Sequence, residues 1–234
     1  MSKWRLFCLI AALVFTGRSS RADTVTFGSA NTSNCLPFGC AGANFISEYQ
    51  QVYSSSRFGP LPFNIAAISF FKTLDLTPDD LTSGIYTISF STTSAAVGAL
   101  NSSLGLGVNL GIDNQVFFTG ALGGSIGTEL TIGGNGTTPV FNYDPTAGNL
   151  LLDITVSGAG PDTFISFDAE APAFLMSRAA DGIVDPLPVG LVTEFSTIPP
   201  PPPISTVPEP GSLLLLGTGL LGMASRARRK SRPA

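Results

Sequence analysis

The residues whose types and spacing most clearly carry chemistry lie together near the C-terminus, between Val207 and Arg232. A Pro-Glu-Pro triplet at 208–210 precedes an uncharged, leucine-rich run at 211–225, and a basic cluster follows that run. Each proline fixes its own φ and restricts the residue before it, so Glu209 should be held extended between Pro208 and Pro210. The basic residues should stay on the cytoplasmic side of a membrane; they are Arg226, Arg228, Arg229, Lys230 and Arg232. Together these parts predict a sorting tail at 207–232.

The apolar run at 211–225 predicts a short transmembrane helix. At about 1.5 Å per residue it would be roughly 22 Å long, against a hydrocarbon core of about 30 Å. Local thinning of the bilayer and snorkelling of Arg226 could make up the difference. So short a span also suits a segment that is held in the membrane only until an enzyme removes it.

In order, spacing and position, this tail resembles the PEP-CTERM sorting element of Gram-negative bacteria. The resemblance implies that an exosortase, a membrane-embedded transpeptidase, recognises Pro208, Glu209 and Pro210 and processes the protein for release or for attachment at the cell surface. The alternative is an ordinary C-terminal membrane anchor. Similar tails occur on many unrelated exported bodies, including some described as ice-binding proteins, so the resemblance does not indicate what the body does.

The first 22 residues predict a secretory signal peptide. Lys3 and Arg5 precede an apolar stretch from Leu6 to Phe15, and small residues flank Arg21 before a cut after Ala22. An uncleaved anchor is the weaker alternative, because the apolar stretch is short for a membrane span. We therefore expect an exported protein that passes through the inner membrane and ends at the cell surface or outside the cell.

The body between these ends, residues 23–198, is strongly acidic. It holds three basic residues, Arg57, Lys72 and Arg178, against fifteen acidic ones, for a net charge of −12. Such a body lacks the basic patch that nucleic-acid binding needs, although it could attract cations. The chain contains no histidine, which excludes a Ser-His-Asp triad, a Cys-His nucleophile and an imidazole metal site.

These exclusions predict a body with no catalytic residues, no metal and no cofactor. A glycosidase that uses two carboxylates stays open as the enzymatic alternative. It would require two buried acidic residues facing each other in a cleft, about 5 to 9.5 Å apart.

Two cysteines remain in the body, Cys35 and Cys40. An even pair in an exported protein predicts a disulfide, and a small loop of this kind would stabilise the fold by roughly 2 kcal/mol. A metal site is the alternative, which two thiols without further ligands make the weaker one.

Two groups of carboxylates and three asparagines are further candidates. Asp75, Asp79 and Asp80 form one acidic cluster and Asp181 and Asp185 another; either could bind calcium, although neither has EF-hand spacing and solvated carboxylates are commoner. Three segments match the N-glycosylation pattern, which is weak evidence in a bacterium; they begin at Asn31, Asn101 and Asn135.

The body is predicted to be all-β, a single antiparallel β-sandwich of jelly-roll or Ig-like type. Short runs rich in β-branched and aromatic residues alternate with Gly, Pro, Asn and Asp about every ten residues. At 85–91 the pattern should bury Tyr86, Ile88 and Phe90, and at 150–157 it should turn Asp153 outward. Strands are expected at 24–27, 45–53, 62–72, 85–91, 104–110, 115–119, 129–132, 139–143, 150–157, 163–168 and 173–177.

A proline-rich linker at 199–206 should separate the body from the tail as a stiff spacer. We expect a cell-surface or extracellular-matrix protein with a non-catalytic body. The alternative is a secreted binding module for polysaccharide, calcium or ice. Ice binding would need a flat, regularly repeated threonine array, and the threonines here keep no fixed period. A polysaccharide-binding face would be indicated by an exposed aromatic row drawn from Tyr49, Tyr53, Tyr86 or Tyr143.

Overall fold

The computed structural model describes most of the body. The described residues are 23–39, 46–75, 79–81, 84–158, 165–172, 174–181 and 189–197. All of them belong to one of the two units into which the chain divides, residues 21–199. The predicted signal peptide, the proline-rich linker and the sorting tail lie outside the described residues, so those assignments stay predictions at the structural level.

The described part of the chain is all-β, as the sequence predicts. It contains sixteen strands, and every strand pair is antiparallel. Two short 3₁₀ helices, η1 (Ser55–Arg57) and η2 (Leu106–Asn109), are the helical turns within these residues. Within the described residues, β7 and β8 are the only paired strands that follow each other in the chain; the other pairs join strands that lie further apart in the sequence.

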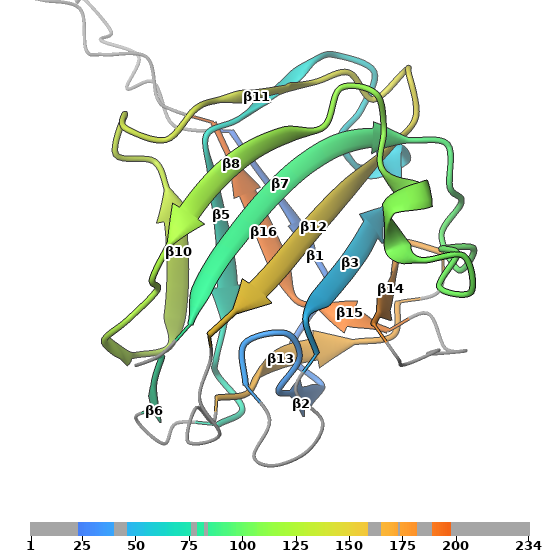
Figure 1. The fold of residues 1–234 in the computed structure, drawn as a ribbon. Coiled ribbons are helices and arrows are strands. Elements are labelled where there is room, and N and C mark those ends of the chain that lie inside the picture. Colours follow the sequence, from blue (N-terminus) through green and yellow to red (C-terminus); the bar gives the residue numbers. More distant parts are fainter. Residues whose placement is uncertain are drawn as a thin grey trace, which may run out of the picture. The chain divides into compact units, whose positions relative to one another are not determined.

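A five-stranded sheet lies at the front of the view in Figure 1. Its strand order is β14, β3, β12, β7 and β8, so β8 is an edge strand. The strands are β14 (Met176–Ala180), β3 (Glu48–Tyr53), β12 (Asn149–Ser157), β7 (Ile85–Thr93) and β8 (Gln115–Gly120).

A four-stranded sheet lies behind it in Figure 1, with the order β1, β16, β5 and β10. The first described strand therefore pairs with the last, and β10 forms an edge. The strands are β1 (Thr24–Phe27), β16 (Thr193–Ser196), β5 (Ala67–Phe71) and β10 (Glu129–Gly133).

Three smaller sheets complete the described part. The strand β13 (Phe167–Glu170) lies between β15 (Gly190–Leu191) and β2 (Thr32–Asn34). The other two sheets are pairs: β11 (Phe141–Tyr143) with β4 (Phe63–Ile65), and β6 (Asp79–Asp80) with β9 (Ser125–Ile126).

Aromatic rings from both large sheets meet in one core. The centroids of Tyr53 in β3 and Phe195 in β16 are 4.9 Å apart, and Phe27 in β1 lies 4.9 Å from Tyr53. Phe90 in β7 lies 6.0 Å from Phe195 at a steep angle. These edge-to-face contacts add to the free energy gained by burying the rings. The two sheets therefore pack against each other through their inner faces.

The alternation predicted for two of the strands is confirmed. In β7, Tyr86, Ile88 and Phe90 are fully buried. In β12, Asp153 lies on the face opposite Leu150, Leu152 and Ile154, as predicted, because successive side chains of a strand point to opposite faces. That face is not solvated, since Asp153 and Leu151 are both buried. The core-facing residues of β12 are Leu150, Leu152, Ile154 and Val156.

The strand predicted at 104–110 is wrong. This segment belongs to the connection between β7 and β8, where Gly105 has φ +86° and residues 106–109 form η2. Leu106 and Asn109 are the buried residues of that turn. A glycine with positive φ interrupts the extended backbone, so the apolar spacing of Leu104, Leu106 and Val108 does not produce a strand.

Candidate functional site

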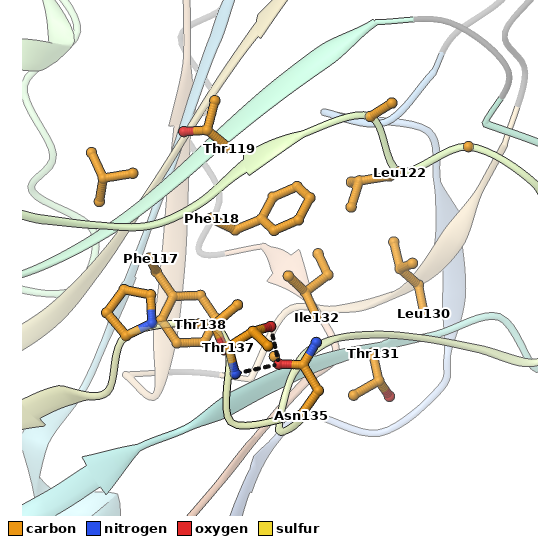
Figure 2. Close-up of a pocket in the computed structure, with 15 residues that line it drawn as sticks. Phe117, Phe118, Thr119, Leu122, Leu130, Thr131, Ile132, Asn135, Thr137 and Thr138 are labelled. Carbon is orange, nitrogen blue, oxygen red and sulfur yellow. Dashed lines mark hydrogen bonds between the residues drawn. The ribbon is translucent and has the colours of Figure 1, made fainter.

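A cleft opens between the two edge strands β8 and β10, at the side of the molecule where both large sheets end (Figure 2). Its volume is about 670 Å³, within the range of about 300–1,000 Å³ typical of ligand pockets. Fifteen residues line it, all from the segment between Val116 and Pro139. We call it the β8–β10 cleft.

The floor of the β8–β10 cleft is apolar. Phe117 is buried and meets Phe90 edge to face with ring centroids 5.0 Å apart, while Leu130 and Ile132 come from β10. Beside them, Phe118 is only partly buried and forms part of the exposed surface of the cleft. Figure 2 shows the Phe118 ring above Ile132.

A β-bulge explains why two consecutive phenylalanines line the same cleft. The pairing of β7 with β8 shifts between Ile88 and Ser89, which pair with Phe118 and Val116 respectively. The extra residue, Phe117, has no partner in the ladder. A bulge of this kind redirects side chains that would otherwise alternate between faces. Phe117 can therefore fill the core while Phe118 occupies the cleft.

The rim of the cleft is polar and rigid near Asn135. Asn135 Oδ1 accepts hydrogen bonds from the backbone N–H of Thr137, at 3.0 Å, and from its hydroxyl group, at 2.7 Å. Because this oxygen must be an acceptor, the amide orientation is fixed. Figure 2 shows the amide nitrogen of Asn135 on the side that faces Ile132. This nitrogen makes no hydrogen bond within the described residues and is available to a ligand.

None of the described residues that line the cleft is ionisable. This is notable in a body with fifteen acidic residues and three basic ones. The polar groups of the rim are hydroxyl and amide groups from Thr119, Thr131, Asn135, Thr137 and Thr138. The cleft therefore offers an aromatic surface and neutral hydrogen-bonding groups, and no counter-charge for an ion.

A second polar cluster lies on the outer face of the five-stranded sheet. Gln50 Nε2 donates to Asp153 Oδ1 at 2.9 Å, and the hydroxyl group of Ser89 donates to Asp153 Oδ2 at 3.3 Å. Asn109, from the β7–β8 connection, donates to Gln50 Oε1 at 2.9 Å. These four side chains are buried although they face away from the aromatic core.

Glu48 lies at the edge of this polar cluster. Burial raises the pKa of its carboxyl group to about 7, and the charge of Asp153, a hydrogen bond with Asp153 and the charge of Asp181 act in the same direction. Glu48 and Asp153 share a partner, since Gln50 Nε2 lies 3.5 Å from Glu48 Oε1 and 2.9 Å from Asp153 Oδ1. Asp153 is buried, whereas a carboxylate-pair glycosidase needs both carboxyl groups to face a cleft with room for a sugar.

Other described carboxylates are bound to the backbone or to hydroxyl groups. Asp168 is buried and accepts hydrogen bonds from the backbone N–H groups of Thr73 and Leu74 at 3.0 Å. Glu170 accepts from the backbone of Ser29. Similar contacts join Asp113 to Thr92, Asp144 to Thr146, Asp181 to Ser47 and Glu194 to Thr26.

The four tyrosines named as a possible sugar-binding row are not exposed. Tyr49, Tyr53, Tyr86 and Tyr143 are fully buried. Burial raises the pKa of Tyr86 to about 12 and that of Tyr143 further still. The condition set by the sequence for a tyrosine-lined face is therefore not met.

The sorting residues lie outside the described part of the chain; these are Pro208, Glu209, Pro210 and the basic cluster Arg226, Arg228, Arg229 and Lys230. Cys35 is described and Cys40 is not, so their pairing stays a prediction. Asp185 and the side chains of Asp79 and Asp80 also lie outside. Within the described residues, no group of three or more Cys, Asp or Glu side chains is placed to hold a metal ion.

The candidate glycosylation asparagines differ in their surroundings. Asn31 and Asn135 are exposed, whereas Asn101 is partly buried. Asn101 Oδ1 accepts hydrogen bonds from the backbone of Ser103 and Leu104.

Among the residues that the structure describes, no helix is long and apolar enough to cross a membrane.

The C-terminal segment is a PEP-CTERM protein-sorting motif. The family model for this motif matches residues 206–230, which contain the triplet at 208–210, the apolar run and most of the basic cluster. The motif implies an exported protein that is processed by an exosortase and sorted to the cell surface. No curated protein and no solved structure matches the chain.

Sequence reasoning missed the β8–β10 cleft. The sequence predicts Phe117 and Phe118 within a strand, where alternation would turn neighbouring side chains to opposite faces. It indicates Asn135 only as a glycosylation candidate. The turn glycines Gly133, Gly134 and Gly136, each with positive φ, could have indicated a tight loop beside a strand edge.

Proposed function

We propose that the chain is a cell-surface or extracellular-matrix protein with a non-catalytic body, which an exosortase processes at the triplet of Pro208, Glu209 and Pro210. The observation that carries this proposal is the PEP-CTERM match at residues 206–230. The triplet lies on the body side of the apolar run, where a transpeptidase could cut the chain without disturbing the body. The basic cluster from Arg226 to Lys230 would stop transfer at the cytoplasmic side.

The hydrogen-bond partners of the buried carboxylates support a body without catalytic activity. Asp168 is satisfied by backbone and hydroxyl donors, and Asp153 by Gln50 and Ser89. Catalytic carboxylates need access to a substrate and a pKa suited to proton transfer. Glu48 has the raised pKa, but its neighbour Asp153 is buried.

We also propose that the body is a β-sandwich. The two large antiparallel sheets share an aromatic core, which is the arrangement of a β-sandwich. Pairing of β1 with β16 holds the two ends of the described body in one sheet. Such a body can present its connections to ligands while its C-terminal linker leads to the sorting tail.

A second candidate function is binding of a polysaccharide outside the cell. The β8–β10 cleft favours it over calcium or ice binding, because its lining combines a partly exposed phenyl ring with uncharged hydrogen-bonding groups. This function would act together with surface display.

The sorting proposal is tested by substituting the triplet in the full chain. Glu209→Ala, and separately Pro208→Ala combined with Pro210→Ala, should leave the protein in the membrane fraction of a host that has its exosortase. A matched control, Glu194→Ala in the body, should still be processed. Equal surface display of wild-type and triplet variants, measured by labelling of intact cells, would overturn the proposal.

A further inference from the structure

We propose that the β8–β10 cleft is a binding site for a short stretch of neutral polysaccharide. This inference deepens the polysaccharide-binding candidate and rests on it, whereas export and sorting do not depend on it. A sugar ring has an apolar face of C–H groups and hydroxyl groups around its edge. The cleft presents the complementary pair, an aromatic side chain and a rim of neutral donors and acceptors.

The Phe118 ring supplies the apolar surface. It is partly exposed, unlike Phe117, which packs into the core. Gly120 leaves room for the ring, since a Cβ atom at that position would lie 3.2 Å from Phe118 Cζ. Beneath the ring, Leu130 and Ile132 hold the floor in place. The surface for a sugar face is therefore formed before a ligand arrives.

The Asn135 amide supplies a fixed donor. Its oxygen is bound twice by Thr137, so its nitrogen cannot rotate away without breaking both hydrogen bonds. Thr137 is committed to this turn, and Thr131 is bound to Ser69 and Glu129. A ligand would meet an oriented N–H₂ group close to an apolar floor, which is an arrangement that selects hydroxyl oxygens as partners.

The absence of charge in the lining sets the class of ligand. A charged group in the cleft would lose hydration and find no counter-charge among the described lining residues. The acidic body would also repel uronic acids and other anionic sugars. The ligand of the cleft is therefore a neutral sugar.

An extended peptide added to a strand edge is the competing occupant. The bulge at Phe117 breaks the ladder of β8, and bulges are a common way of blocking edge-to-edge pairing. Gln115, at the start of β8, is also held by the connection between β10 and β11, since its Nε2 atom donates to Val140 O at 3.4 Å. These features favour a sugar over an added strand.

The test measures binding to the purified full chain by isothermal titration calorimetry. The neutral probes are maltotriose, cellotriose, mannotriose and N,N′,N″-triacetylchitotriose, together with neutral oligosaccharides from the host's own extracellular polysaccharide. The acidic probe is trigalacturonate, and the peptide probe is an extended, uncharged Thr-Val repeat. We expect at least one neutral probe to bind and neither of the other two.

Two substitutions locate the binding site, and a third serves as the control. Phe118→Ala should weaken binding at least tenfold by removing the apolar surface. Asn135→Asp keeps the acceptor for Thr137 but replaces the donor with a charge, and should weaken binding at least fivefold without affecting folding. Phe174→Ala removes an equally large ring that is 83% exposed elsewhere, and should change affinity less than twofold.

Several results would overturn the proposal. These are failure of every neutral probe to bind the wild-type chain at millimolar concentration, preference for trigalacturonate or the peptide, and equal affinity in wild type and Asn135→Asp. The C-terminal mass of each variant is measured in parallel. Normal processing with no sugar binding would refute the site alone, whereas sugar binding without processing would refute the sorting function alone.

Discussion

Gln50 lies against Asp153 on the outer face of the five-stranded sheet, with Gln50 Nε2 2.9 Å from Asp153 Oδ1. The β7–β8 connection contributes Asn109, which binds the other end of the Gln50 amide. These polar side chains are therefore buried on a face of the sheet that would otherwise contact solvent. The free energy of unfolding should depend on their hydrogen bonds.

Asn109→Ala should lower the free energy of unfolding by about 2 kcal/mol, because buried polar groups would lose their partners. Asn109 donates to Gln50 Oε1 and to the backbone oxygen of Asn101, and accepts from the Asn101 N–H group. Urea unfolding measures the change. The control is Asn114→Ala at an exposed position of the same connection, for which we expect a change below about 0.5 kcal/mol. Equal stability of the two variants would contradict this role of Asn109.

Stability should fall as the pH rises through the pKa of Glu48. Its folded-state pKa, about 7, is above the ordinary value of 4.5, so the folded chain binds this proton more tightly than the unfolded chain. The contribution is complete below about pH 4.5 and is lost by about pH 7. Solvent screening of the partly exposed group reduces it to about 1 kcal/mol.

Glu48→Gln isolates this effect, because the amide mimics the protonated acid next to Asp153 and Asp181. The difference in unfolding free energy between pH 5 and pH 8 should be smaller in this variant than in wild type. If the unfolding free energies of the two proteins, measured with urea, changed equally with pH, Glu48 would not be the cause of the pH dependence of stability.

Gly133 and Gly136 offer a matched pair at the rim of the cleft. Both have positive φ, but a Cβ atom at Gly133 would lie 2.4 Å from the backbone oxygen of Ala66 and 2.8 Å from Phe117 Cζ, whereas at Gly136 it would meet nothing within 4 Å. Gly133→Ala should therefore cost about 2 kcal/mol more than Gly136→Ala. Thermal unfolding of the two variants checks this, and equal costs would show that the contacts with Ala66 and Phe117 do not restrict this position.

Tyr53 and Thr193 connect the two large sheets through a buried hydrogen bond of 2.9 Å between their hydroxyl groups. A double-mutant cycle with Tyr53→Phe and Thr193→Val should give a coupling energy of about 1 kcal/mol. Tyr86→Phe with Thr193→Val serves as the uncoupled reference, since Tyr86 donates to the backbone of Phe38 instead. Strictly additive effects of Tyr53→Phe and Thr193→Val would contradict the connection.

The sequence predicted those parts of the fold that depend on local pattern. Alternation in 85–91 and 150–157 identified the buried faces of β7 and β12, because one side of each strand meets the core. It failed where one residue changes the backbone: Gly105 turns an apparent strand into η2, and the bulge at Phe117 creates the cleft. Neither effect follows from the spacing of apolar residues.

Contacts between residues far apart in the chain could not be predicted from the sequence for a different reason. The strand β16 is short and was not predicted, yet it lies between β1 and β5 and contributes Phe195 to the core. Gln51 looks like a surface residue, but it is fully buried and binds the backbone of Leu191 through both ends of its amide. Partners separated by 140 positions leave no local pattern.

The most direct test of the account is the intact mass of the mature C-terminus. The full chain is expressed in its host and in the same host lacking the exosortase, and each cell fraction is analysed. Loss of the residues beyond Pro210 only where the exosortase is present, with the protein at the cell surface or in the medium, is the expected result. An intact tail up to Ala234 in the membranes of both hosts would contradict exosortase sorting and leave a simple anchored protein.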